Sequence, residues 1–189
     1  MAVKTFTTNE VLTASDTNTY LANAGLVYVT SLTWASTSNA QQINNCFTST
    51  YDNYRIVISA TSASTSPDNV YLRLVDGITP DSSAVYGSNI TTSNGVSGLS
   101  NTWTGIVNQL YVGYLANLTG FVTIDIANPQ VSGKVSTTHA FSTGFGNSTQ
   151  LVSTIFGLTT STTQYEGLYI YPGGGTWAGT CTVYGYRKG

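Results

Sequence analysis

From Leu26 onward the chain alternates between short runs of β-branched and aromatic residues and short runs of turn residues. Within Arg55–Ser59, Val70–Leu74 and Phe121–Ile126 the apolar side chains fall mainly at every second position, as in a strand with one buried face. The predicted strands are Val27–Trp34, Gln41–Phe47, Tyr54–Ala63, Val70–Asp76, Val85–Thr92, Thr104–Val112, Gly120–Ala127, Val135–Ser142, Leu151–Leu158, Gly167–Tyr171 and Gly179–Tyr186. This pattern predicts an all-β fold, an antiparallel β-sandwich of jelly-roll type with about 8–10 strands.

One helix is predicted, near the start of the chain. Ser15 can cap residues 16–24, and Gly25 can end the helix in the left-handed conformation. A helix of about two turns is not stable alone, so this one must pack on another surface. The residues expected to form this anchor are Val11, Leu12, Ser15, Tyr20 and Leu21. We therefore expect an attachment segment over residues 1–25 and a β-sandwich body over residues 26–189.

The polar positions of the chain are mostly neutral. Only 7% of the residues are charged and the net charge is −2, whereas Ser, Thr and Asn together account for 68 of the 189 residues. Nucleic-acid binding needs clustered Lys and Arg, which are absent here. No run of 18 apolar residues is present, so membrane insertion is not expected. This composition favours contact surfaces over acid–base chemistry, and no cofactor or metal is expected.

Catalytic signatures are sparse. The chain has one histidine, His139, which we interpret as an ordinary strand residue, and the common nucleophile, phosphate-loop and zinc motifs are missing. Glycoside hydrolysis needs only two carboxylates at the right separation, so a glycan depolymerase is kept as a remote alternative. Its candidate carboxylates are Asp76, Asp81, Asp125 and Glu166. We expect a protein that is not an enzyme.

Two cysteines, Cys46 and Cys181, each lie in a predicted strand and show no metal-like spacing. We interpret them as reduced core residues, with a disulfide as the alternative.

Aromatic residues gather in two parts of the chain and are the best candidates for contacts, because Tyr and Trp are common at protein interfaces and on sugar-binding surfaces. In the segment 167–172, Leu168 and Ile170 fall on one face and Tyr169 and Tyr171 on the other. One of these rows must face away from the core, which favours a subunit interface over a ligand surface. The candidate ligand or interface residues are Trp103, Tyr111, Tyr114, Tyr169, Tyr171 and Trp177.

Three segments of the chain carry a resemblance. Phe6–Asn23, Phe47–Val57 and Gly179–Lys188 are similar to segments of small fibre-type proteins of tailed bacteriophages, especially phages of marine bacteria and cyanobacteria. The resemblance implies a virion structural protein whose amino-terminal piece attaches to the particle and whose β-rich body lies on the surface. It implies a homotrimer, assembled in the cytoplasm of the bacterial host. It supplies no functional residues.

These observations lead to a tail fibre or spike that binds other virion proteins and has a host-surface glycan or protein as its further partner. The chain has no shaft repeats and no coiled-coil heptads, which leaves a second hypothesis open. That alternative is a capsid decoration protein, of the cement or head-fibre kind, which stabilises or decorates the phage head.

Overall fold

The computed structural model describes residues 7–11, 13, 25–62, 68–93, 98–145 and 150–188. The strands are β1 (Leu26–Thr37), β2 (Gln41–Ile43), β3 (Asn53–Ser62), β4 (Asp68–Asp76), β5 (Thr79–Pro80), β6 (Tyr86–Ser93), β7 (Leu99–Val107), β8 (Leu110–Leu115), β9 (Thr119–Ala127), β10 (Thr137–Phe145), β11 (Gln150–Thr159), β12 (Gly167–Pro172) and β13 (Trp177–Tyr186). No helix occurs among the described residues. The prediction of an all-β antiparallel fold is therefore confirmed, and the predicted helix over residues 16–24 lies outside the described residues.

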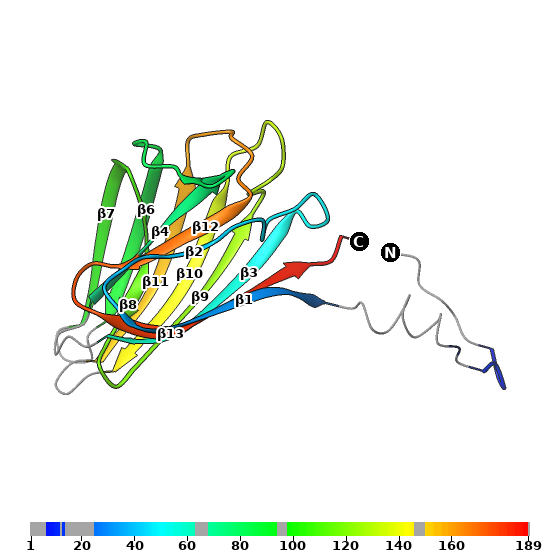
Figure 1. The fold of residues 1–189 in the computed structure, drawn as a ribbon, viewed down its shortest axis with the longest axis horizontal. Helices are drawn as coiled ribbons and strands as arrows, with labels where there is room; N and C mark the ends of the chain where they lie inside the picture. The colour runs from blue at the N-terminus through cyan, green and yellow to red at the C-terminus, as the bar shows by residue number, and fades with distance from the viewer. Residues whose placement is uncertain are drawn as a thin grey trace.

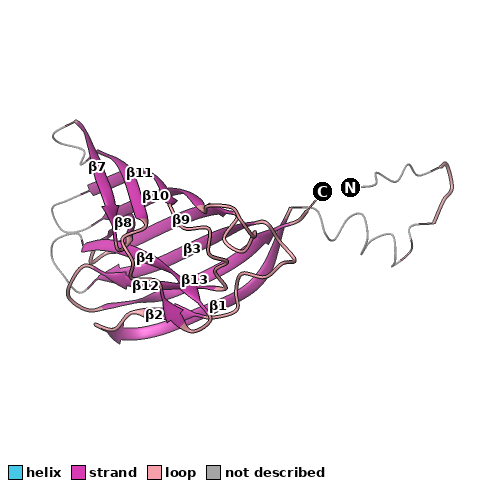
Figure 2. Cartoon of the chain, turned by 90° about the horizontal axis from the view of Figure 1, so that it is seen from above, coloured by secondary structure: helices cyan, strands magenta, loops and turns pink. Residues whose placement is uncertain are grey.

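The strands form two sheets packed face to face (Figures 1 and 2). The larger sheet has the order β1-β13-β3-β9-β10-β11-β6-β7, and the smaller has the order β2-β12-β4-β5 with β8 also paired to β4. Four antiparallel pairs are nested along the chain: β1 with β13, β2 with β12, β3 with β9, and β4 with β8. The chain therefore enters and leaves the body at one place, where the Arg187 amide donates to the Gly25 carbonyl at 3.3 Å.

The core lies between the two sheets, and β3 shows how the sequence builds it. Tyr54, Ile56 and Ile58 are fully buried, whereas the residues between them face outward. Leu72 on β4 and Ile170 on β12 are buried from the opposite sheet. Burial of each such side chain contributes about 1.5–3 kcal/mol, so strict alternation on the central strands fixes which face of each sheet points inward.

Strand β8 lies very close to the larger sheet, and a small residue stands at each crossing. A Cβ added at Gly113 of β8 would lie 2.5 Å from Ser142 Cβ on β10. Added at Gly120 of β9 it would lie 2.6 Å from Leu115, and at Gly157 of β11 it would lie 2.7 Å from Leu110. Real Cβ atoms do not approach this closely, so bulky side chains cannot occupy these inward positions.

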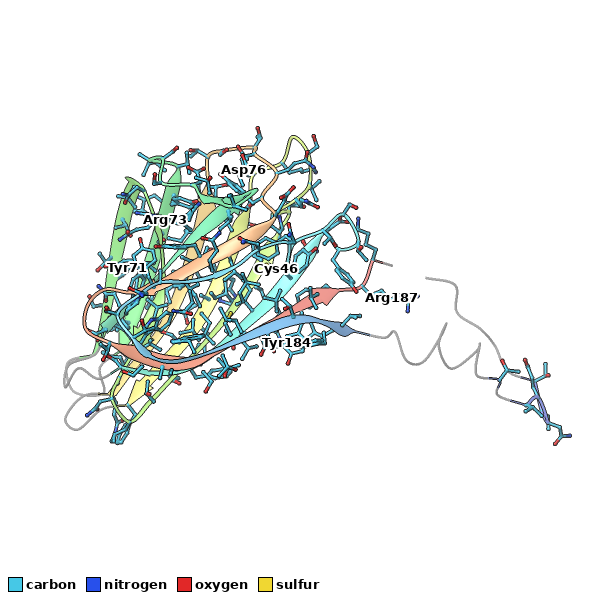
Figure 3. All side chains as sticks on the ribbon, viewed as in Figure 1. Cys46, Tyr71, Arg73, Asp76, Tyr184 and Arg187 are labelled. Atoms are coloured by element: carbon cyan, nitrogen blue, oxygen red, sulfur yellow. The ribbon has the colours of Figure 1, made fainter. Side chains whose placement is uncertain are left out.

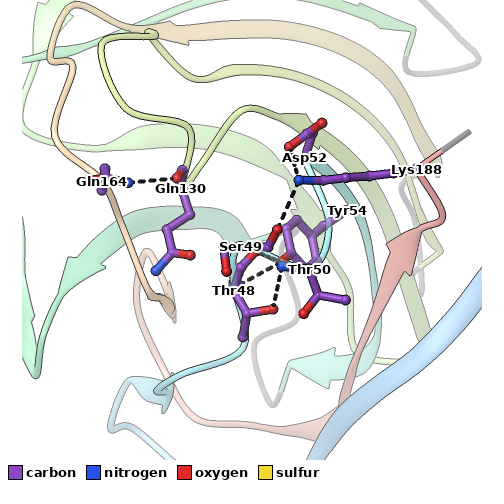
Figure 4. A network of polar contacts seen from close by, with 8 residues as sticks. All are labelled: Thr48, Ser49, Thr50, Asp52, Tyr54, Gln130, Gln164 and Lys188. Atoms are coloured by element: carbon purple, nitrogen blue, oxygen red, sulfur yellow. Dashed lines mark hydrogen bonds and ion pairs between the residues drawn. The ribbon is translucent and has the colours of Figure 1, made fainter.

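A network of polar contacts ties the end of β13 to the loop before β3 (Figure 4). The Tyr54 hydroxyl donates to the Thr48 carbonyl at 2.8 Å and accepts from the Thr48 amide at 2.6 Å. Lys188 Nζ donates to the Ser49 carbonyl at 2.9 Å and forms an ion pair with Asp52 at 2.7 Å. These contacts satisfy loop backbone groups that have no strand partner.

Two predicted strands need correction. The prediction of one strand over Thr104–Val112 is wrong, because β7 ends before Asn108 and β8 begins after Gln109, in the other sheet. Neither Asn108 nor Gln109 is Gly or Pro, so no strong break signal marks this turn. The predicted strand Gln41–Phe47 ends at residue 43, since Asn45 adopts a positive φ of 53° and turns the chain.

Both cysteines are free and fully buried in the core, so the disulfide alternative is wrong. Figure 3 shows Cys46 inside the sandwich. Burial raises the pKa of the Cys46 thiol to about 12, and burial likewise raises the pKa of Cys181 to about 12. Because the thiolate is the reactive form, both groups are chemically protected in the folded protein.

We therefore expect that a thiol-specific alkylating reagent at mildly alkaline pH labels neither cysteine of the native protein and both cysteines in guanidinium chloride. Mass spectrometry of the intact protein measures the number of labels. Unfolded, unreduced protein that takes up no label would contradict free thiols.

Candidate functional site

The outer face of the larger sheet carries an exposed apolar array on its central strands. On β10 the inward residues are small, as at Ala140 and Ser142, whereas His139 and Phe141 face outward. On β9 and β11 bulky side chains also face outward, although β9 keeps large apolar residues such as Ile124 on its inward face. We call this array the phenylalanine face; it consists of Phe121, Phe141, Phe145, Val152 and Phe156, with side chains 40–58% exposed.

One row of outward side chains crosses the larger sheet in register. From β3 to β7 its members are Arg55, Asp125, His139, Phe156, Asn89 and Trp103. The rings of His139 and Phe156 are stacked, with centroids 4.7 Å apart and planes 10° apart. The row ends at Trp103, which is 60% exposed on the edge strand. Aromatic surface therefore continues from the phenylalanine face to the edge of the sheet.

The carboxylate in this row is held on three sides. Asp125 accepts hydrogen bonds from Arg55 Nε at 2.8 Å and Arg55 Nη2 at 2.7 Å, and from the Tyr186 hydroxyl at 2.6 Å. The hydrogen bonds from Arg55 lower the pKa of Asp125, against the effect of partial burial. The carboxylate is consequently an ionised acceptor, fixed in a depression of about 700 Å³ that His139 and Phe156 also line.

The outer face of the smaller sheet is rich in tyrosine. The predicted alternation of residues 167–172 is confirmed, because Leu168 and Ile170 are buried while Tyr169 and Tyr171 face outward. In register, Tyr171 lies opposite Tyr71. We call this surface the tyrosine face; it consists of Tyr71, Tyr111, Tyr114, Tyr169 and Tyr171.

Contacts with neighbouring side chains immobilise these rings. Tyr71 packs on Tyr171 with centroids 5.5 Å apart, and its hydroxyl accepts from Asn69 Nδ2 at 2.9 Å. The Tyr171 hydroxyl bonds to Gln109, and the guanidinium of Arg73 lies 5.4 Å from the centre of the Tyr171 ring. Figure 3 shows Tyr71 and Arg73 side by side in the body.

A groove of about 370 Å³ lies where the smaller sheet ends short of β7. Strand β8 packs on β9, β10, β11 and β6. Seven of the nine residues of β7 are exposed, including inward-pointing Ser100 and Thr102. Tyr111 and Tyr114 of β8 line the opposite wall, with ring centroids 5.2 Å apart. The groove is thus open between a tyrosine wall and a wall of hydroxyl groups.

Tyr111 is the most unusual residue of this groove. Its side chain is 93% buried, from a relative exposure of 7%, and its hydroxyl makes no well-formed hydrogen bond among the described residues, although it interacts with the Tyr114 side chain. Burial raises the pKa of Tyr111 above the ordinary range of a phenol, so the hydroxyl stays protonated and remains a donor. A buried hydroxyl without a partner costs about 1–3 kcal/mol and calls for an explanation.

The two tryptophans proposed from the sequence differ in position. Trp103 lies on the surface, whereas Trp177 is 1% exposed and packs on Trp34 with centroids 4.5 Å apart. The Trp177 indole donates to the Asn39 carbonyl at 3.0 Å. The suggestion that Trp177 contacts a ligand is therefore corrected, because the side chain belongs to the core. The exposed bend Gly173–Gly175 precedes β13, and Trp177 is the first residue of that strand, facing the core.

The remaining candidate carboxylates lie near the end of β4. Asp81 accepts from the buried Tyr165 hydroxyl at 2.6 Å and from the Ser83 amide at 2.9 Å, so it caps the turn that follows β5. Burial alone would raise the pKa of Asp81, but these hydrogen bonds outweigh it and lower the pKa. Asp76 ends β4, and the Glu166 amide donates to Val75. Across the described residues no three His, Cys, Asp or Glu side chains gather as metal ligands.

Of the predicted anchor residues, the structure describes only Val11, which is 77% exposed. Leu12, Ser15, Tyr20 and Leu21 lie outside the described residues.

Comparison with models of protein families, with curated proteins and with solved structures gives no match. Among the described residues there is no helix of the length and apolarity that crossing a membrane requires.

Sequence reasoning missed the phenylalanine face and the groove. The signal for the first was present in residues 137–145, where small residues and phenylalanines alternate. Ordinary patterning assigns Phe141 and Phe145 to the core, and the structure does the opposite. The groove had no local signal, because its walls come from strands in different sheets.

The contacts of Asp125 lead to a prediction about acid stability. Its pKa is lower in the folded protein than the value of about 3.9 for an unfolded chain. The stabilisation is therefore fully present above that value and is lost as the pH falls through the folded pKa. Both partners of the ion pair are about one-third exposed, so solvent screens the pair and Asp125→Asn should cost about 1 kcal/mol or less.

Denaturant unfolding at a series of pH values measures this cost. The difference between wild type and Asp125→Asn should be constant at neutral pH and disappear in strong acid, whereas Asp76→Asn, at an exposed strand end, should show a smaller difference throughout. A difference that grows on acidification would contradict the assignment.

Proposed function

We propose that this chain is a non-enzymatic virion structural protein of a tailed bacteriophage, of the tail fibre or spike type. It attaches to the particle through residues 1–25 and associates with further copies of itself through the phenylalanine face. The attachment to a phage rests on the resemblance of the three sequence segments. The observation that carries the assembly role is the exposed apolar array on the larger sheet.

The array supports assembly because it serves no purpose within the monomer. Phe141 and Phe156 are 44% and 58% exposed on adjacent strands, and small residues fill the inward positions beside Phe141 on β10. Contiguous exposed apolar surface on a folded protein marks an interaction site. These strands lie in the middle of the sheet, where all backbone groups are paired, so a partner would bind through side chains. A low charge suits such a neutral interface.

The position of the chain ends supports attachment from one end of the body. Residue 25 lies beside residue 187, so the segment before the body starts at one end of β1. Attachment at this end leaves the outer faces of both sheets uncovered by it. A homotrimer, as the resemblance implies, would then pack the phenylalanine faces together around an axis.

We also propose that the sandwich is an extended jelly roll. The four nested pairs support this, since they describe one long antiparallel ribbon that is folded over itself. Strands β10, β11, β6 and β7 would then extend the larger sheet beyond the eight strands of the basic fold.

The assembly role is tested with the double variant Phe141→Ser and Phe156→Ser in the full chain. We expect wild type to be an oligomer at micromolar concentration. The dissociation constant of the oligomer should be about 100-fold higher or more in the double variant, because buried aromatic residues dominate interfaces. Light scattering coupled to gel filtration measures the mass. The matched control is Ile78→Ser, which alters an apolar residue that is more exposed, at 78%, in the β4–β5 turn. A monomeric wild type, or an unchanged oligomer in the double variant, would overturn the role of this face.

The place on the particle is tested by the number of copies per virion, measured by quantitative mass spectrometry against the major capsid protein. A fibre or spike predicts a few to a few dozen copies, because its attachment sites are few. Hundreds of copies, scaling with the capsid subunits, would instead establish the decoration alternative. Absence from purified particles would contradict both.

A further inference from the structure

We propose that the groove between β8 and β7 binds a neutral carbohydrate chain. This site lies on the inner side of the larger sheet, away from the phenylalanine face, and its existence does not depend on the proposed assembly role. Three features of the groove support this: the chemistry of its walls, one buried hydroxyl and the rigidity of its aromatic rings.

The walls match a ligand with polar edges and apolar faces. One wall presents hydroxyl groups of Ser100, Thr102 and Thr104 at every second position of β7, roughly 6.5–7 Å apart along the strand. The other wall presents the rings of Tyr111 and Tyr114. Hydroxyl groups both donate and accept, and aromatic rings pack against C–H groups. A pyranose ring has hydroxyls around its rim and C–H groups on its faces.

The absence of charge narrows the class of ligand. The groove is lined by Asn69, Tyr71, Ile90, Thr92, Gly98, Ser100, Thr102, Thr104, Tyr111, Tyr114 and Leu151, and none of these is ionic. A phosphate, sulfate or carboxylate group would lose hydration here without gaining a cation. Its volume of about 370 Å³ lies within the usual range for ligand pockets, roughly 300–1,000 Å³.

Tyr111 gives the second, independent observation. Its protonated hydroxyl is a donor that interacts with the Tyr114 side chain without a well-formed hydrogen bond, on a side chain that lines the groove. A ligand oxygen beside Tyr114 would satisfy it. Ligand binding would then gain the free energy of a hydrogen bond that the empty groove does not make.

The rings are held in place before any ligand arrives. Tyr71 is fixed by Asn69 and by Tyr171, and Tyr111 packs edge-on against both Tyr71 and Tyr114. Rigid aromatic walls reduce the entropy that binding would otherwise cost.

The test uses the full chain and neutral oligosaccharides of glucose, mannose, galactose and N-acetylglucosamine, with an oligogalacturonate as the charged probe. Saturation-transfer NMR detects binding and calorimetric titration measures it. We expect a neutral oligosaccharide to bind and the charged probe not to bind. Tyr111→Phe should weaken binding about tenfold, because it removes one hydrogen bond, and Tyr114→Ala should weaken it by at least as much.

Two controls separate binding from folding. Tyr169→Ala removes a ring from the same face of the smaller sheet, outside the groove, and should leave binding unchanged. Tyr111→Phe should melt no lower than wild type, since the hydroxyl it removes makes no well-formed hydrogen bond among the described residues. Failure of every neutral probe at millimolar concentration overturns the proposal, as does binding of the charged probe alone. Binding that neither groove variant alters overturns the site.

Failure here is distinguishable from failure of the assembly role. The groove variants should leave the oligomeric mass unchanged, and the Phe141→Ser and Phe156→Ser variant should keep its affinity for the saccharide.

Discussion

The close approach of β8 to β9, β10 and β11 is the constraint on which the rest of the structure depends. Gly113, Gly120 and Gly157 stand at the three crossings, and each lacks space for even one more carbon atom. Ser142 adds a hydrogen bond at the middle crossing, accepting from the Tyr114 amide at 3.3 Å. Because packed interiors leave no room to absorb extra volume, the inward positions at these crossings must remain small.

Both candidate surfaces follow from this one strand. Small inward residues on β10 leave Phe141 and His139 on the outward positions, which produces the phenylalanine face. The hydrogen bonds of β8 to β4 also set the edge of the smaller sheet, and β7 extends past that edge. The groove is the space that results. The position of β8 therefore leaves apolar surface exposed on one side of the larger sheet and hydroxyl groups exposed on the other.

The fold class and most strands could be predicted from the sequence, because the bulky residues at every second position of a strand are normally the buried ones. This rule holds on β3 and β12. The rule fails on β10, since glycine and serine at the crossings leave no space for phenylalanine. The boundary between β7 and β8 was missed because residues 108 and 109 carry no strong turn signal. Tyr111 was among the candidate ligand or interface residues, but its burial and its place in the groove depend on the opposite sheet, and no local pattern contains that information.

The nested pairing of the strands also determines when the body can form during synthesis. Strand β13 lies between β1 and β3, so the hydrogen bonds of both neighbours remain incomplete until residue 186 has left the ribosome. Pairing across such a separation is slow, because a long loop must close before any contact is gained. Until then the edges of β1 and β3 and the outward phenylalanines are exposed together in the nascent chain. The larger sheet is therefore completed only after β13 has emerged, and aggregation would compete with folding until then.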